Sequence, residues 1–467
     1  MLARMHARRS VGVVVVVVVA ALWRASSAGA AEPFTLERDT GYRGIWYQIP
    51  GKDGVPKYSG GLATYPQQIR PMAIYAKAAN KTFFVYGGRS KEKNELLHMV
   101  SYFDHATGTV PRPRILLNKK TGDAHDNPAL AINADGFLWV FSNTHGPQKR
   151  SSIHRSAKPY SIESFETVAG EISLSYGQPW YLDGRGFMLV QNRYTDGRAV
   201  AFQTSADGRE WSAPRLLAQF KGHYQVSAPS PDGKRIGVMF NYHPRGLDTR
   251  TNLYYIETAD FGRTWRNVKG EALDVPLKEA VNSALVREHE SRSELVYLKD
   301  LQFDAAGRPI LLFLTSKGHL AGESFGPHVW HTAHWTGDGW RMRDVTKSDH
   351  NYDFGQLYLE EGAWKLIAPT DPGPQPFVTG GDIVMWTSAD EGAAWTKLKT
   401  LTHDSPRPHT FVRQPRNAHP QFYAYWADGD ALRESTSHLY FTDKDGSAVW
   451  QLPAEMAGES EKPRLLK

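Results

Sequence analysis

Three copies of one short pattern constrain the fold of this chain more than any other feature. Complete copies run from Thr258 to Trp265 and from Ser388 to Trp395, and a copy one residue shorter runs from Ser205 to Trp211. The Asp and Gly of each copy suit a tight hairpin turn, and the closing Trp can pack between neighbouring sheets. The tryptophans are 54 and then 130 residues apart. The longer interval is close to two periods, which indicates a structural unit that recurs along the chain.

The composition supports short strands joined by tight turns. The chain has 41 glycines, 28 prolines and 12% aromatic residues, and no long stretch of helical periodicity. Strand–turn–strand patterns recur, for example at 130–141 and 301–313. Units of roughly 60 residues give about seven blades, within the usual range of propellers. We therefore predict an all-β fold: a single seven-bladed β-propeller over residues 31–467, built from repeats of the Asp-box (BNR) type.

The first 30 residues have the features of a secretory signal peptide. Arg4, Arg8 and Arg9 precede an apolar run that includes Val13–Val19, and small residues 28–30 form an A-x-A cleavage pattern. The apolar run is shorter than the ~20 residues that span a bilayer. We expect cleavage near Ala30, a secreted or periplasmic protein and no membrane span.

Removal of this segment changes the charge balance. The full chain carries 55 basic and 49 acidic residues, a net charge of +6, and four of its arginines lie in residues 1–30, which contain no acid. The remaining chain is close to neutral, which argues against general binding of nucleic acids. An anionic ligand must therefore be held by local arginines and histidines. We also expect a monomer.

Two histidines form the first candidate site. His125 lies within 122–128 and His145 within 143–146, on either side of one predicted hairpin. A hairpin brings its two ends together, so both imidazoles can face one point. Around the next hairpin, Tyr176 precedes the turn, and Arg193 and Arg198 follow it.

The stretch 122–146, the opening 41–47 and the segments 241–244 and 250–255 resemble the BNR-4 group of Asp-box propellers. That group includes polysaccharide lyase families 24 and 25, which are ulvan lyases, and related enzymes that act at rhamnose–glucuronate linkages. The resemblance runs from about residue 40 to residue 453. It implies a seven-bladed propeller whose substrate is an acidic polysaccharide or oligosaccharide.

The resemblance also implies an active site. Two histidines, a tyrosine and an arginine would fall on His125, His145, Tyr176 and either Arg193 or Arg198. A second tyrosine would be Tyr242. Of the two arginines, Arg193 is preferred for its place in the run 192–194. Four further residues are candidates for binding the substrate: Arg198, His243, Arg250 and Asn127. No cofactor is implied, although members of the group can carry a structural cation, for which the sequence names no ligands.

These residue types suit β-elimination on a uronate. An arginine and a histidine can neutralise the carboxylate beside C5, and a tyrosine can remove the C5 proton. A glycoside hydrolase of sialidase-like or rhamnosidase type remains an alternative, although the Arg-Ile-Pro motif of sialidases is missing near the N-terminus. A second alternative is a non-catalytic carbohydrate-binding propeller, with four tryptophans as stacking platforms: Trp46, Trp180, Trp330 and Trp335.

Overall fold

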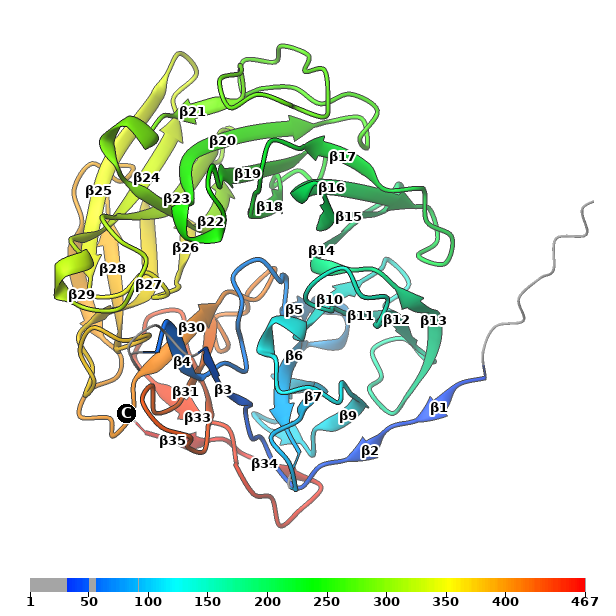
Figure 1. The fold of residues 1–467 in the computed structure, drawn as a ribbon. Coiled ribbons are helices and arrows are strands. Elements are labelled where there is room, and N and C mark those ends of the chain that lie inside the picture. Colours follow the sequence, from blue (N-terminus) through cyan, green and yellow to red (C-terminus); the bar gives the residue numbers. More distant parts are fainter. Residues whose placement is uncertain (1–31, 50–55, 91, 467) are drawn as a thin grey trace, which may run out of the picture.

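The computed structural model describes residues 32–49, 56–90 and 92–466, so the predicted signal peptide and its cleavage near Ala30 lie outside the described residues. Seven antiparallel sheets of four or five strands surround a central axis (Figure 1). This confirms the prediction of an all-β, seven-bladed propeller. No helix among the described residues is long and apolar enough to cross a membrane.

Each blade is an antiparallel meander whose first strand lies nearest the axis, where it contacts the inner strands of neighbouring blades. Blade 1 contains β5 (Ala73–Ala76), β6 (Lys81–Arg89), β7 (Leu96–Asp104) and β9 (Arg114–Asn118). Blade 2 contains β10 (Pro128–Ile132), β11 (Leu138–Ser142), β12 (Ser151–Ser156) and β13 (Ser164–Ile172). Blade 3 contains β14 (Ser175–Leu182), β15 (Gly186–Thr195), β16 (Gly197–Ser205) and β17 (Arg215–Ala218).

The other four blades follow the same order. Blade 4 contains β18 (Gln225–Pro229), β19 (Ile236–Tyr242), β20 (Thr251–Thr258) and β21 (Leu285–Arg287). Blade 5 contains β22 (Leu295–Phe303), β23 (Pro309–Ser316), β24 (His328–Trp335) and β25 (Trp340–Ser348). Blade 6 contains β26 (Gln356–Glu360), β27 (Ala363–Asp371), β28 (Asp382–Ser388) and β29 (Thr396–Thr400). Blade 7 contains β30 (His409–Arg413), β31 (Ala424–Asp428), β32 (Leu439–Thr442) and β33 (Val449–Gln451).

The two ends of the chain close the ring. β1 (Phe34–Thr35) and β2 (Glu37–Arg38) add fifth strands to blades 2 and 1, and β35 (Arg464–Leu465) adds one to blade 7. β34 (Ser460–Glu461) pairs with β8 (Val110–Pro111) near blade 1. The amide of Ile45 donates to Gly87 of blade 1, and that of Gly44 donates to Ser437 before β32. Blades 1 and 7 are thus tied by strands from both ends.

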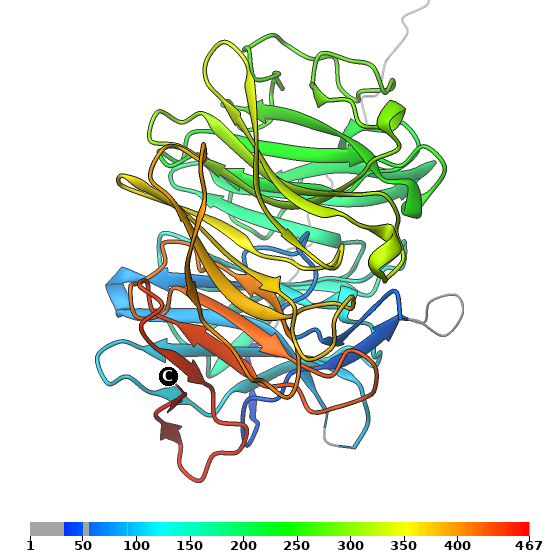
Figure 2. The ribbon, with the colours of Figure 1, turned by 90° about the vertical axis from the view of Figure 1, so that its left-hand side faces the viewer.

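Short elements connect these strands. The hairpin of β3 (Trp46–Ile49) and β4 (Tyr58–Gly61) projects from one face of the ring (Figure 2). Among the described residues, the 3-10 helices are η2 (Lys77–Ala79), η3 (Ala124–Asp126), η4 (Leu247–Thr249), η5 (Glu290–Arg292) and η6 (Glu323–Phe325).

The Asp-box turns join the third and fourth strands of blades 3, 4 and 6. In blade 4, Thr258 Oγ1 accepts from the amide of Gly262 at 2.9 Å, and Asp260 accepts from the amide of Thr264 at 2.9 Å. Gly262 has φ +82°, and a Cβ there would lie 2.3 Å from the ring of Phe202 in blade 3. The motif therefore shapes a turn and packs it against the neighbouring blade.

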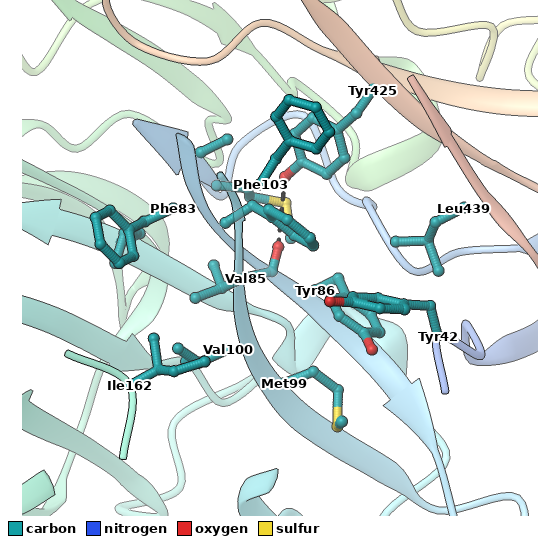
Figure 3. Packing of buried hydrophobic residues seen from close by; sticks show 14 of the residues in the cluster. Tyr42, Phe83, Val85, Tyr86, Met99, Val100, Phe103, Ile162, Tyr425 and Leu439 are labelled. Atoms are coloured by element: carbon teal, nitrogen blue, oxygen red, sulfur yellow. Dashed lines mark hydrogen bonds between the residues drawn. The ribbon is translucent and has the colours of Figure 1, made fainter. Parts of the chain in front are cut away.

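Apolar side chains fill the spaces between blades. Phe83, Val85 and Met99 of blade 1 pack with Tyr425 and Leu439 of blade 7 in a completely buried cluster (Figure 3). Because strands alternate their side chains between two faces, each sheet can pack against both neighbours.

The segment 62–72 lies near the axis, in blue close to the centre of Figure 1. The Arg413 guanidinium donates to the carbonyl of Thr64 at 2.6 Å, and Arg70 pairs with Asp300 of blade 5 at 2.7 Å. Gln178 of blade 3 donates to the carbonyl of Gln68 at 2.9 Å. Held by these bonds, the segment fills the middle of the ring and separates its two faces.

Candidate active site

Polar and aromatic residues gather at the face where the inner strands begin. His125 lies in η3 just before β10, Tyr176 lies at the start of β14, and Tyr224 immediately precedes β18. The inner strands of neighbouring blades begin at the same end of the axis, so residues at equivalent positions meet there. Tyr58 and Tyr65 reach this group from β4 and the segment that follows it.

The two predicted histidines lie face to face. The ring centroids of His125 and His145 are 4.3 Å apart, and their planes differ by 16°. Asp123 lies beside both: one carboxylate oxygen is 2.5 Å from Nδ1 of His125 and the other is 3.2 Å from Nδ1 of His145. His125 is buried, whereas 34% of the His145 side chain is exposed. His145 is therefore the imidazole that a ligand can reach.

Hydrogen bonds assign the tautomer of His125. Its Nδ1 donates to the Asp123 carboxylate, and its Nε2 lies 2.6 Å from the hydroxyl of Tyr58 and 2.9 Å from that of Tyr65. Burial lowers the pKa of His125, although the Asp123 carboxylate opposes that shift. His125 is therefore neutral near pH 7, and Nε2 accepts from a tyrosine hydroxyl.

A second cluster pairs two tyrosines with two arginines. The hydroxyls of Tyr176 and Tyr224 are 3.3 Å apart, and the Tyr176 ring lies 5.8 Å from that of His145. The Arg198 guanidinium lies 4.4 Å from the centre of the Tyr224 ring, and the Arg250 guanidinium lies 5.2 Å from it. Two cations therefore lie close to the Tyr224 ring.

The arginines give the two tyrosines different acidities. Burial alone raises the pKa of Tyr224, but Arg198 and Arg250 outweigh it and hold that pKa below its usual value. Burial and the nearby Tyr224 raise the pKa of Tyr176 well above its usual value. Tyrosines with separated pKa values can act as base and acid in one reaction.

The structure brings Arg198 into this cluster, whereas Arg193 lies elsewhere. Tyr194 pairs directly with Arg198 across β15 and β16, and neighbouring residues of a strand face opposite sides. Arg193 therefore faces the blade 2 side, where it donates to the carbonyl of Ser173 at 3.0 Å. The expected convergence of Arg193 with the histidines is wrong for this geometric reason.

Two other predicted site residues, Tyr242 and Asn127, lie outside the Tyr176–Tyr224 cluster. Tyr242 packs against Phe220, with ring centroids 5.3 Å apart, and does not join the Tyr176–Tyr224 pair. Asn127, expected to bind substrate, is fully buried and donates to the carbonyl of Leu62 at 2.9 Å, so it supports the central segment.

His243 and Arg250 do belong to the cluster, although both are buried. The His243 ring lies 5.2 Å from that of Tyr224, and burial together with Arg250 and Arg198 lowers the pKa of His243 well below its usual value. Arg250 donates to the hydroxyl of Tyr352 at 3.2 Å and lies over the ring of Tyr297 at 4.3 Å. Both therefore shape the surroundings of Tyr224.

Four members of this site were not among the predicted site residues: Asp123, Tyr58, Tyr65 and Tyr224. The signal for Tyr224 was its equivalence to Tyr176, since both lie where the first strand of a blade begins and shortly before a buried glutamine, Gln225 or Gln178. Asp123 was detectable as the residue two positions before His125.

Asp123, His125 and His145 are also the residues that could hold a metal ion. One ligand atom from each lies within 4.8 Å of the others. Two imidazoles and a carboxylate suit a divalent transition metal. In the described geometry both Nδ1 atoms instead lie within hydrogen-bond distance of Asp123.

Two further observations concern substrate access. A cleft of about 490 Å³ opens beside the cluster, lined in part by Arg198, His243 and Lys221. The tryptophans considered as stacking platforms are all buried, with exposures of 6%, 3%, 0% and 8%: Trp46, Trp180, Trp330 and Trp335. None of them offers an open face for a sugar ring.

The chain is similar to several known proteins. Residues 75–348 match the model described as a BNR repeat-containing family member. An ulvan lyase of Alteromonas sp. (strain LOR) is 22% identical over 370 residues, which cover 70% of this chain and 73% of that protein. An ulvan lyase of Nonlabens ulvanivorans is 26% identical over 347 residues, covering 65% of this chain and 70% of that protein.

Solved structures of an ulvan lyase of polysaccharide lyase family 25 share the fold. One has a TM-score of 0.70 at 17% identity and covers 88% of this chain and 96% of that one. A second, bound to -[GlcA(1-4)Rha3S]-, has a TM-score of 0.69 at 16% identity and covers 89% and 96%. The family match spans more than half of the chain, and the propeller carries the family's repeats. The chain therefore belongs to the BNR repeat-containing family, as its resemblance to the BNR-4 propellers implied.

Proposed function

We propose that this protein is a polysaccharide lyase that cleaves a uronate-containing polysaccharide, of the ulvan or rhamnose–glucuronate kind, by β-elimination. The observation that carries the proposal is the position of Tyr224, close to both Arg198 and Arg250 and beside Tyr176. A tyrosine with a lowered pKa is a base suited to a weakly acidic carbon. The curated relatives named ulvan lyases support the same reaction class.

In the proposed reaction, the substrate carboxylate lies against the guanidinium of Arg198. A guanidinium beside the carboxylate stabilises the negative charge that develops when C5 loses its proton. Tyr224, as the phenolate, takes that proton. The C4–O4 bond then breaks, a C4–C5 double bond forms, and O4 leaves with the electron pair.

Tyr176 is the proposed acid. Its raised pKa keeps it protonated, and its hydroxyl lies 3.3 Å from that of Tyr224. It can therefore protonate O4 as the bond breaks, and the proton taken by Tyr224 can return to Tyr176 afterwards. The Asp123–His125–His145 group has a positioning role, because Asp123 lies within hydrogen-bond distance of Nδ1 of both rings and leaves Nε2 of His145 open.

The remaining expectations form part of this proposal. The protein is exported after cleavage near Ala30, acts as a monomer and needs no cofactor for elimination. The buried tryptophans disfavour the non-catalytic binding alternative.

Incubation with ulvan tests the reaction. Elimination produces a conjugated uronate that absorbs ultraviolet light, and this absorbance should rise with each new reducing end. Reducing ends without that absorbance would instead mean hydrolysis. Binding without either product would leave a carbohydrate-binding propeller.

A further inference from the structure

Arg416 lies at the opposite end of the propeller axis from the candidate active site. Tyr176 of the site lies near the start of inner strand β14, and Trp180 lies four residues further along, about 13 Å away at ~3.3 Å per residue. The Arg416 guanidinium lies 5.9 Å from the Trp180 ring. The central segment, held by Arg413 and Gln178, separates the two ends.

A cavity of about 220 Å³ opens at this second end. Its lining includes three arginines and several neutral polar groups: Arg70, Arg413, Arg416, Ser230, Gln302 and Gln414. No carboxylate is part of that lining. Because Arg70 is paired with Asp300, the positive charge of the cavity that lacks a carboxylate partner comes from Arg413 and Arg416.

Two of these arginines already have strong partners. Arg70 forms an ion pair with Asp300 at 2.7 Å, and Arg413 donates to the carbonyls of Thr64 and Pro66. These bonds hold the central segment in place. Neither guanidinium needs a ligand to be satisfied.

Arg416 differs because its charge has no such partner. Its side-chain hydrogen bond runs to the carbonyl of Tyr181 at a long 3.4 Å. In the part of the chain that the structure describes, no carboxylate lies within ion-pair distance of it. Burial lowers its pKa, so the protein environment disfavours its charge. A partly buried cation without an anion is costly, and a bound oxyanion reduces that cost.

A second groove meets the cavity at Arg416. It has a volume of about 530 Å³ and shares Pro231, Arg416 and Asn417 with the cavity. Tyr160, Tyr181 and Asn133 line it and offer aromatic and hydrogen-bonding groups of the kind that bind sugars. Its two carboxylates, Asp183 and Asp232, are exposed, so an anion is favoured in the cavity and a neutral part in the groove.

We propose that Arg416 anchors a second, non-catalytic site that binds the oxyanion group of an acidic saccharide, with the carboxylate or sulfate in the cavity and the sugar chain along the groove. The choice of a saccharide rests on the proposed function, whereas the oxyanion site rests on the cavity alone. Such a site would hold a long polymer on the face away from the reaction.

Titration calorimetry with sodium glucuronate tests this site. The parent is the full protein with Tyr224→Phe, which prevents turnover, and ionic strength is held constant with sodium chloride. Two binding equivalents are expected. Arg416→Gln should remove one of them with more than a tenfold loss of affinity, and Arg198→Gln should remove the other. Arg263→Gln, an exposed arginine, is the matched control for charge and should leave both.

Fold integrity can be followed in the same proteins. The main chain of Arg416 bonds to Ala73 and Tyr75, and a change of side chain keeps those bonds. Without ligand, Arg416→Gln should melt at the same temperature as the parent or higher, because an unpaired cation is gone. Glucuronate should raise the melting temperature of the parent more than that of Arg416→Gln.

Each other outcome has a defined meaning. If Arg416→Gln still binds as many equivalents of glucuronate as the parent does, the proposed site is overturned. Sodium sulfate binding as tightly as glucuronate would overturn the saccharide and leave a site for free oxyanions. The lyase proposal is tested separately, by ultraviolet absorbance in protein that keeps Tyr224. Loss of the second site should leave elimination from short oligosaccharides unchanged in that assay. Failure of the lyase proposal and failure of this site are therefore distinguishable.

Discussion

The imidazole rings of His125 and His145 stack 4.3 Å apart, and the carboxylate of Asp123 lies within hydrogen-bond distance of Nδ1 of both. One carboxylate thereby orients two histidines that come from opposite ends of a hairpin. Burial alone would raise the pKa of Asp123, but its bonds and charge interactions with the histidines hold that pKa well below its usual range. The ionised carboxylate is thus the centre of this group.

Asp123→Asn should reduce kcat about 10- to 100-fold, because an amide can accept from only one of the two Nδ1–H groups. Steady-state kinetics on ulvan across a range of pH measures the effect, and a positioning role predicts a changed pH profile with a smaller change in KM. Asp135→Asn, on the exposed turn of the same hairpin, is the control. Activity of Asp123→Asn within twofold of the parent would contradict this role.

Tyr224→Phe should lower kcat by about 10²–10⁴-fold, since it removes the proposed base. Tyr242→Phe should retain near-parent activity, because that ring packs against Phe220 outside the cluster. Initial rates of ultraviolet absorbance compare the two variants. The reverse order of effects would return the second catalytic tyrosine to Tyr242.

Arg198→Gln should decrease activity and move the ascending limb of the pH–rate profile. The active form carries the Tyr224 phenolate, so kcat/KM rises with pH through the Tyr224 pKa. Removal of Arg198 raises that pKa, and the limb shifts to higher pH. Arg193→Gln makes the same charge change on the blade 2 side and should leave the profile in place. Equal shifts in both variants would mean a general charge effect.

Asp126→Asn should stabilise the protein more at pH 8 than at pH 4. Burial raises the pKa of Asp126 to about 6, above the unfolded value of 3.8. The folded protein therefore loses stability as the pH rises between these two pKa values. The variant avoids this loss because an amide does not ionise. Chemical denaturation at the two pH values should give a difference of about 2–3 kcal/mol in the mutational effect. No pH dependence of that effect would contradict the raised pKa.

Gly262→Ala should destabilise the fold more than Gly270→Ala does. Both glycines have positive φ, +82° and +84°, which costs an alanine about 1–2 kcal/mol. Only at Gly262 would the new Cβ meet the Phe202 ring at 2.3 Å, whereas nothing lies within 4 Å at Gly270. The clash should add roughly 1–3 kcal/mol in denaturant unfolding. Equal losses would mean that blade packing at the Asp-box tolerates a methyl group.

The repeated blade and half of the site were predictable from local sequence patterns. Asp-box turns act within a few residues, so Thr258 and Gly262 could be identified from spacing alone. The pairing of His125 with His145 was also predictable, because one hairpin joins them. Local chemistry was sufficient in both cases.

Which arginine and which second tyrosine join the histidines depends on contacts between strands and blades. Arg193 and Arg198 flank one turn, and the strand register alone determines that Arg198 shares a face with Tyr194 while Arg193 faces the other side. Tyr224 meets Tyr176 because two blades, 48 residues apart in sequence at these positions, begin their inner strands at one end of the axis. Such contacts depend on how the blades close into a ring, which no local pattern encodes.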